Sequence, residues 1–216
     1  MSWQAAGRYA VLKGFALVPN YCPDASLRTV YDYDYLLSAE SMVSVQRSLE
    51  AGGYVRKPDR EEHPIVYFQA SRPLWLPSRQ EDLYAAGLPR TIELHYRFWD
   101  NNSVGIPLGL PQDTLTRIRL RDWQGLRFYS LGEEDELVFH VLHAFRHILN
   151  YWCRLSTFLE IACFLERRSS DAAFWERFTE RIQSAPPLPE IVGVVFLLAT
   201  RLFGAEIPPA VARSTT

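Results

Sequence analysis

Residues 29 to 37 of the chain read Thr29-Val30-Tyr31-Asp32-Tyr33-Asp34-Tyr35-Leu36-Leu37. Aromatic residues alternate here with Asp32 and Asp34, which is the period of a β-strand. Successive side chains of a strand point to opposite faces, so both carboxylates are expected on one face, about 6 to 7 Å apart. At that spacing they can bind one divalent cation jointly or bridge two.

The segment before this strand predicts an anion-binding turn. Tyr9 to Leu12 has the apolar composition of a short buried strand, which Lys13 and Gly14 end. A strand that ends in glycine and opens a helical turn presents backbone amides to an anion, and the lysine adds a point charge. The chain contains only two lysines, so a lysine at position 13 is unusual for this sequence and indicates a specific role. Arg28, four residues before Asp32, could reach a phosphate or the carboxylates, or lie on the surface.

A second strand supplies a third carboxylate. After a helix predicted from the N-cap Ser38 through Glu50, residues 91 to 98 alternate apolar side chains with Glu93, His95 and Arg97. Glu93 could join the two aspartates on Mg²⁺, an arrangement that draws a hydroxyl onto a phosphorus and helps pyrophosphate leave. His95 shares its face and could support the site or have a purely structural hydrogen bond. The alternative for the aspartates is a solvated edge strand.

The second half of the chain is predicted to be helical. Acidic residues follow Gly132 at a helix start, and further helices are expected at about 155–167, 171–184 and 189–203. His140, His143 and His147 share one helix face, so zinc binding is one interpretation and ordinary packing the other. Residues 115–128 fit either a strand or a helix, and they include a basic stretch that could meet a polyanionic acceptor or form a solvated face: Arg117, Arg119, Arg121 and Arg127.

Composition excludes several classes of protein. The chain has 216 residues, of which 48% are apolar and 22% charged, so it is expected to fold into one or two lobes. Its net charge of −2 gives no global attraction to nucleic acid or to an anionic membrane. Three widely spaced cysteines and no long apolar run predict a cytoplasmic protein with no membrane partner.

As an ordered set, these motifs resemble the uncharacterised nucleotidyltransferase family related to the DNA polymerase β superfamily. The resemblance covers roughly residues 10 to 204. The matching features are the Leu12-Lys13-Gly14 turn, Arg28, the Asp32 to Leu37 strand, Gly53-Tyr54, Glu93-Leu94-His95, Leu131 to Asp135, and the His143 and His147 pair.

The resemblance implies an activity and a site. Asp32, Asp34 and Glu93 would be catalytic and would hold two Mg²⁺ ions, with Mn²⁺ as an alternative, and Glu93 would help to deprotonate the acceptor hydroxyl. Lys13, Gly14 and Arg28 would bind the nucleotide, and His143 and His147 would contact phosphate or support the carboxylates, while His95 would support the site. The protein would move a nucleoside monophosphate from an NTP to a small molecule, a peptide or protein, or, with less support, RNA.

The implied fold is α+β, a small mixed-sheet nucleotidyltransferase lobe at residues 1–128 followed by a helical lobe at 129–216 that closes the cleft. Two departures support an alternative function, a catalytically weak relative that acts as a binding or regulatory partner. Phe15 follows Gly14 where the superfamily commonly has serine, and Tyr31 occupies a position that is usually small. The third interpretation is a zinc hydrolase built on the histidine helix.

Overall fold

The computed structural model describes residues 8–24, 26, 28, 30, 32–58, 64–69, 90–101 and 105–214. The chain forms two units, each assembled from three separate stretches. Unit 1 consists of Met1–Ala16, Ser26–Arg97 and Ile118–Ser130, and unit 2 consists of Leu17–Ala25, Phe98–Arg117 and Leu131–Thr216. A mixed sheet and a set of helices confirm the predicted α+β class.

Unit 1 is built on a seven-stranded sheet with the order β3-β4-β5-β2-β1-β7-β6. β2 pairs parallel with β5 and β1 pairs parallel with β7, whereas the remaining neighbours are antiparallel. The strands are β1 (Tyr9–Val11), β2 (Asp32–Leu37), β3 (Tyr54–Arg56), β4 (Ile65–Gln69), β5 (Thr91–His95), β6 (Arg119–Trp123) and β7 (Leu126–Ser130).

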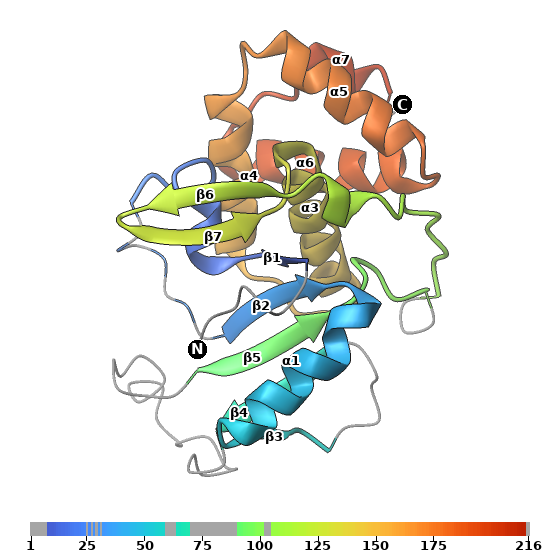
Figure 1. Cartoon of the computed structure of the whole chain (residues 1–216). Coiled ribbons are helices and arrows are strands. Elements are labelled where there is room, and N and C mark those ends of the chain that lie inside the picture. The colour runs from blue at the N-terminus through green and yellow to red at the C-terminus, as the bar shows by residue number, and fades with distance from the viewer. Residues whose placement is uncertain are drawn as a thin grey trace. The chain divides into compact units, whose positions relative to one another are not determined.

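α1 (Ala39–Ala51) lies against one face of the part of this sheet that includes β4 and β5 (Figure 1). Ser38 caps the helix as predicted, because its hydroxyl accepts from the backbone N–H of Ser41. The buried face of α1 packs on apolar side chains of β2, β4 and β5. Together, the helix and strand side chains form a core cluster of Leu37, Met42, Val45, Leu49, Ile65, Tyr67, Ile92 and Leu94. Alternation along the strands therefore places Asp34 and Glu93 on the opposite face.

The stretch that fitted either a strand or a helix is a β-hairpin. β6 and β7 are joined by Gln124 and Gly125, which both have positive φ (50° and 80°), the backbone conformation of a tight two-residue hairpin turn. The predicted strand at 91–98 is shorter in the structure and ends at His95. β3 was not predicted, since three residues are too few to show a period. Thr29 and Tyr31, the first part of the predicted 29–37 strand, lie outside the described residues.

Unit 2 contains the helices of the second half of the chain. The predicted helices at 155–167, 171–184 and 189–203 are confirmed to within one residue, and Gly204 ends the last of them in the left-handed conformation. Among the described residues, no helix is both long and apolar enough to cross a membrane. The helices are α3 (Glu133–Leu149), α4 (Leu155–Arg167), α5 (Ala172–Gln183), α6 (Leu188–Phe203) and α7 (Pro209–Ala212).

The core of unit 2 is rich in aromatic rings and draws on all three stretches of its chain. Leu17, Tyr21, Trp99 and Leu108 from the earlier stretches are buried together with the apolar faces of α3 to α7. Unit 2 therefore depends on residues far upstream of its helices.

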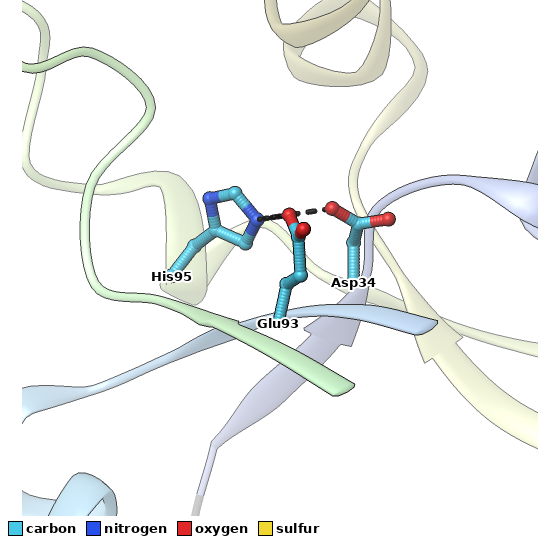
Figure 2. A group of neighbouring side chains, drawn as sticks. All are labelled: Asp34, Glu93 and His95. Carbon is cyan, nitrogen blue, oxygen red and sulfur yellow. Dashed lines mark hydrogen bonds and ion pairs between the residues drawn. The ribbon is translucent and has the colours of Figure 1, made fainter. Parts of the chain in front are cut away.

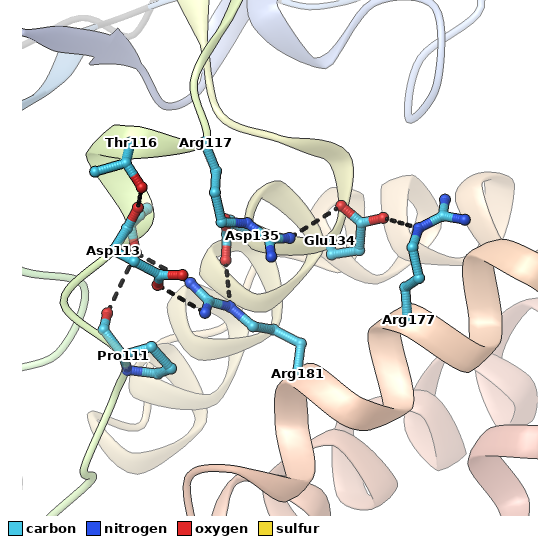
Figure 3. Close-up of polar contacts among 9 residues, drawn as sticks. Pro111, Asp113, Thr116, Arg117, Glu134, Asp135, Arg177 and Arg181 are labelled. Carbon is cyan, nitrogen blue, oxygen red and sulfur yellow. Dashed lines mark hydrogen bonds and ion pairs between the residues drawn. The ribbon is translucent and has the colours of Figure 1, made fainter.

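An ion-pair network ties the start of α3 to two other parts of unit 2 (Figure 3). Glu134 accepts from Arg117 and from Arg177 of α5, while Asp135 accepts from Arg117 and from Arg181 of α5. Burial raises the pKa of Asp135 even though both arginines oppose it. The acidic residues predicted at the start of α3 thus also connect this helix to α5 and to the segment that carries Arg117. Buried charges of this kind restrict which segments can pack there, because each charge needs a partner.

Candidate functional site

Two neighbouring parallel strands bring the predicted carboxylates together. In the register of β2 and β5, Asp32 lies opposite Thr91, Asp34 opposite Glu93, and Leu36 opposite His95. Strands in a sheet are about 4.8 Å apart, so side chains of paired residues on one face are immediate neighbours. Asp34 and Glu93 are therefore adjacent because of strand pairing.

Lys13 joins this group from β1. That strand runs antiparallel to β2, and the backbone N–H of Leu12 donates to the carbonyl oxygen of Asp34 at 3.0 Å. The next residue, Lys13, then directs its Nζ to Asp34 Oδ1 at 2.8 Å. Its side chain is 11% exposed and that of Asp34 is fully buried, so this is an interior ion pair.

His95 contacts both of the paired carboxylates (Figure 2). Its Nε2 lies 3.0 Å from Asp34 Oδ1 and 3.7 Å from Glu93 Oε2. The histidine is 1% exposed, at the last residue of β5. A buried imidazole that donates to Asp34 fixes the orientation of that carboxylate.

The pKa values of the group reflect a balance between burial and charge. For Asp34, burial opposes ionisation, but the Lys13 charge and the His95 hydrogen bond outweigh it and hold the pKa below its usual range. For Asp32, burial and the neighbouring Asp34 charge raise the pKa. For Lys13, burial favours the neutral amine, yet the charges of Asp34, Asp32 and Glu93 raise the pKa. The carboxylates therefore repel one another, and an additional positive charge beside them would lower this repulsion.

One oxygen of Asp34 fits a bound cation. Lys13 and His95 both approach Oδ1, whereas Oδ2 is buried and has no hydrogen-bond partner among the residues that the structure describes. A buried carboxylate oxygen without a partner is energetically unfavourable in protein alone. Asp34, Glu93 and His95 each offer a ligand atom within 4.8 Å of the other two. Because His95 Nε2 carries the proton that it donates to Asp34, the ligands for a divalent ion would come from the two carboxylates, which suit such an ion.

Two further residues predicted to bind the nucleotide also belong to unit 1. Gly14 has a φ of +67°, and a Cβ at this position would lie 3.3 Å from the side chain of Val30, so the turn after Lys13 requires glycine. The helical turn predicted to follow it is a 3-10 helix at Gly14–Leu17. Arg28 is half-buried. The roles of all these residues in binding and catalysis stay predictions.

The histidines of α3 lie in unit 2 and have separate surroundings. His143 and His147 contact each other, with 3.0 Å between their Nε2 atoms. His140 instead lies 3.0 Å from Glu160 of α4 and packs against the ring of Tyr21. Within the described residues, the group of three potential ligands that forms is Asp34, Glu93 and His95, and it contains none of the three α3 histidines.

Sequence reasoning placed these side chains on common strand faces but missed two contacts. The ion pair of Lys13 with Asp34 was not anticipated, because Lys13 was interpreted only as a ligand for phosphate. The hydrogen bond of His95 to Asp34 follows from the register of β2 and β5, which alternation within one strand does not reveal. Strand pairing is the information that would have found both.

The stability contributed by Asp34 and His95 is expected to be greatest between about pH 4 and pH 6.5. The pKa of Asp34 is lower in the folded state than its ordinary value of 3.8, so its contribution is present above about pH 4 and lost as the pH falls through the folded value. The pKa of His95 is raised above 6.5, so its contribution is complete below about pH 6.5 and lost as the pH rises through the folded value.

A His95→Gln variant tests this pH dependence. Urea unfolding should show a larger deficit in unfolding free energy relative to wild type at pH 5.5 than at pH 9, by about 1.4 kcal/mol for each pKa unit of the His95 shift. A deficit of equal size at both pH values would contradict the proposed charge on His95.

The fold and the site together define an α+β protein with a cluster of acidic side chains on one sheet face. The family model described as "Uncharacterised nucleotidyltransferase" matches residues 4–204, and the chain belongs to this family. Among solved structures, an antigenic nucleotidyltransferase-like protein from Paracoccidioides brasiliensis is similar, with 15% sequence identity, 88% of each chain covered and a TM-score of 0.42. No curated protein matches the chain.

Proposed function

We propose that this protein is a Mg²⁺-dependent nucleotidyltransferase that transfers a nucleoside monophosphate from an NTP to a hydroxyl-type acceptor and releases pyrophosphate. Membership of a nucleotidyltransferase family supports a transferase, and the acidic sheet face supports the metal dependence. The observation that carries the proposal is Asp34 Oδ2, which is buried and without a hydrogen-bond partner among the described residues, beside Glu93.

Asp32, Asp34 and Glu93 would hold the metal, with two ions expected and Mn²⁺ as an alternative. When bound, Mg²⁺ would offset charge on the attacking and leaving oxygens. His95 keeps Asp34 oriented by donating to Oδ1, so that Oδ2 stays available. Glu93, 21% exposed, can also accept the proton of an acceptor hydroxyl.

The turn after β1 would hold the triphosphate. Lys13 brings a positive charge to the end of β1, and the positive φ of Gly14 lets the backbone turn at that point. Backbone amides at such a turn, together with a lysine, form a binding site for phosphate oxygens. Most of the rate enhancement would come from positioning and charge neutralisation.

One observation favours the second candidate, a catalytically weak relative that acts as a binding or regulatory partner. Phe15 packs its ring edge-to-face on Phe128, with 4.8 Å between the centroids, at the position where the superfamily commonly has serine. Phosphate contacts at this turn are therefore limited to the backbone and Lys13. Such a protein would release no pyrophosphate, whether or not it binds NTP.

Calorimetric titration with ATP, GTP, CTP and UTP, in the presence and absence of Mg²⁺, tests the proposed function. Wild-type protein is expected to bind at least one NTP only with Mg²⁺. The Asp32→Asn, Asp34→Asn double variant should lose at least about 100-fold in affinity, because metal ligands are removed directly. Asp122→Asn is the matched control, since this aspartate is exposed on β6, and it should bind as wild type does.

Pyrophosphate release in the presence of candidate hydroxyl acceptors then separates the two candidate functions. Turnover that the double variant lacks supports transfer, and binding without turnover supports the binding relative. If no NTP binds to the wild-type protein under any of these conditions, the proposed transferase activity fails, and the search turns to protein partners.

A further inference from the structure

The alternating arginines of β6 are not equivalent in the structure. Arg121 lies opposite Phe128 of β7 in the hairpin, and its guanidinium carbon is 5.5 Å from the centroid of that ring. Its side chain is half-buried, whereas Arg127 of β7 is exposed. Because successive residues of a strand point to opposite faces, Arg127 and Phe128 lie on different faces of the hairpin. Arg121 therefore differs from an arginine on a solvent-exposed strand face, because it packs against Phe128.

The guanidinium of Arg121 forms a hydrogen bond with the predicted phosphate-binding turn. Its Nη1 donates to the carbonyl oxygen of Ala16, two residues after Gly14. Ala16 is 1% exposed and belongs to one core cluster with Val11 and Phe128. The ring of Phe15 packs on the same Phe128. The hairpin thus holds both residues that follow Gly14.

A turn of this length needs such support. The 3-10 helix at Gly14–Leu17 has four residues, and its backbone bond from Ala16 N–H to the Lys13 carbonyl is long, at 3.4 Å. Short 3-10 segments have poor hydrogen-bond geometry and leave carbonyls at their ends without partners in the segment. A cation at the carboxyl end of a helical turn is favourable. The Lys13 pair with Asp34 fixes the start of the turn, and Arg121 fixes its end.

We propose that Arg121 is a positioning residue for nucleotide binding, which holds the Gly14–Leu17 turn in the conformation that receives the phosphates of the NTP. This inference rests on the proposed function. Arg121 acts through the Ala16 carbonyl and the Phe128 ring, so it affects the nucleotide through the turn. Nucleotide affinity should then depend on a hairpin more than 100 residues away in the sequence, since Ala16 and Arg121 are separated by 105 positions.

The test compares Arg121→Met with Arg127→Met, which removes an arginine from the same hairpin. Arg121→Met keeps an unbranched apolar side chain on Phe128 but removes the donor to Ala16. It should raise the Kd and KM for Mg²⁺-NTP about tenfold or more, with kcat at saturating NTP within about threefold of wild type. Arg127→Met should bind Mg²⁺-NTP with the affinity of wild type, and Arg121→Lys, which retains a donor, should recover part of the affinity.

Amide hydrogen exchange gives a readout that does not depend on activity. Exchange at Gly14, Phe15 and Ala16 should accelerate in Arg121→Met and not in Arg127→Met, whereas the α1 amides should be unchanged in both. If the wild-type protein binds NTP and Arg121→Met binds it equally well, or if exchange in the turn is unaltered, the positioning role is wrong while the proposed function stands. If wild type binds no NTP, the proposed function fails, and the role of Arg121 in nucleotide binding fails with it.

Discussion

Replacing Asp34 with asparagine is expected to lower the free energy of unfolding by about 3–5 kcal/mol, because a buried ion pair then keeps only its cation. Lys13 Nζ and His95 Nε2 both approach Asp34 Oδ1, at 2.8 and 3.0 Å. Both donors have almost no contact with solvent, so water cannot replace the lost anion. Urea unfolding near pH 6, where the pair contributes most, measures the loss.

A double-mutant cycle with Lys13→Met separates the ion pair from other effects of the substitution. Removing both charges should cost less than the sum of the two single substitutions, with a coupling energy of about 1–3 kcal/mol. Asp122→Asn, on the exposed side of β6, should change stability by less than about 0.5 kcal/mol. Strict additivity of Asp34→Asn and Lys13→Met would show that the pair is not formed in solution.

Trp175→Ala is expected to destabilise unit 2 by about 3–5 kcal/mol, since a large ring is removed from the centre of an aromatic cluster. Trp175 is 2% exposed, and its ring centroid lies 4.9 Å from that of Phe174 and 5.7 Å from that of Phe178. Its indole N–H also donates to the carbonyl oxygen of Arg168 at 2.6 Å. Thermal and urea unfolding of the full chain measure the effect.

Two matched variants divide this effect into its parts. Trp175→Phe keeps an aromatic ring but loses the donor to Arg168, and should cost about 1–3 kcal/mol. Trp152→Ala removes the same kind of side chain from a site where it is 53% exposed, and should cost less than about 1 kcal/mol. A loss in Trp152→Ala as large as that in Trp175→Ala would be inconsistent with the burial of Trp175.

The helices and the central strands could be predicted because each carries its own local signal. α4 and α5 have apolar side chains at helical spacing, and β2 and β5 alternate strictly enough to place Asp34 and Glu93 on defined faces. The hairpin of β6 and β7 could not be assigned, because its turn, Gln124-Gly125, is not one of the common Asn-Gly or Asp-Gly pairs.

The candidate site was predictable as a set of residues and not as a set of contacts. Asp32, Asp34, Glu93 and Lys13 follow from alternation and from the lysine-glycine turn. That Lys13 and His95 converge on one oxygen of Asp34 depends on the pairing of β1 and β5 with β2, which is a property of the assembled sheet. The same holds for Arg121, whose importance depends on Ala16, a residue distant in the chain.

The interleaving of the two units along the chain constrains the order in which they can fold during synthesis. β1 is synthesised long before its neighbour β7, which ends at Ser130, so the sheet cannot close until the chain has been made through Ser130. Leu17 and Trp99 must likewise wait for helices α3 to α6 before their core exists. Newly made chains therefore expose apolar segments of both units until these later segments have been made, and dependence on chaperones is expected to be high.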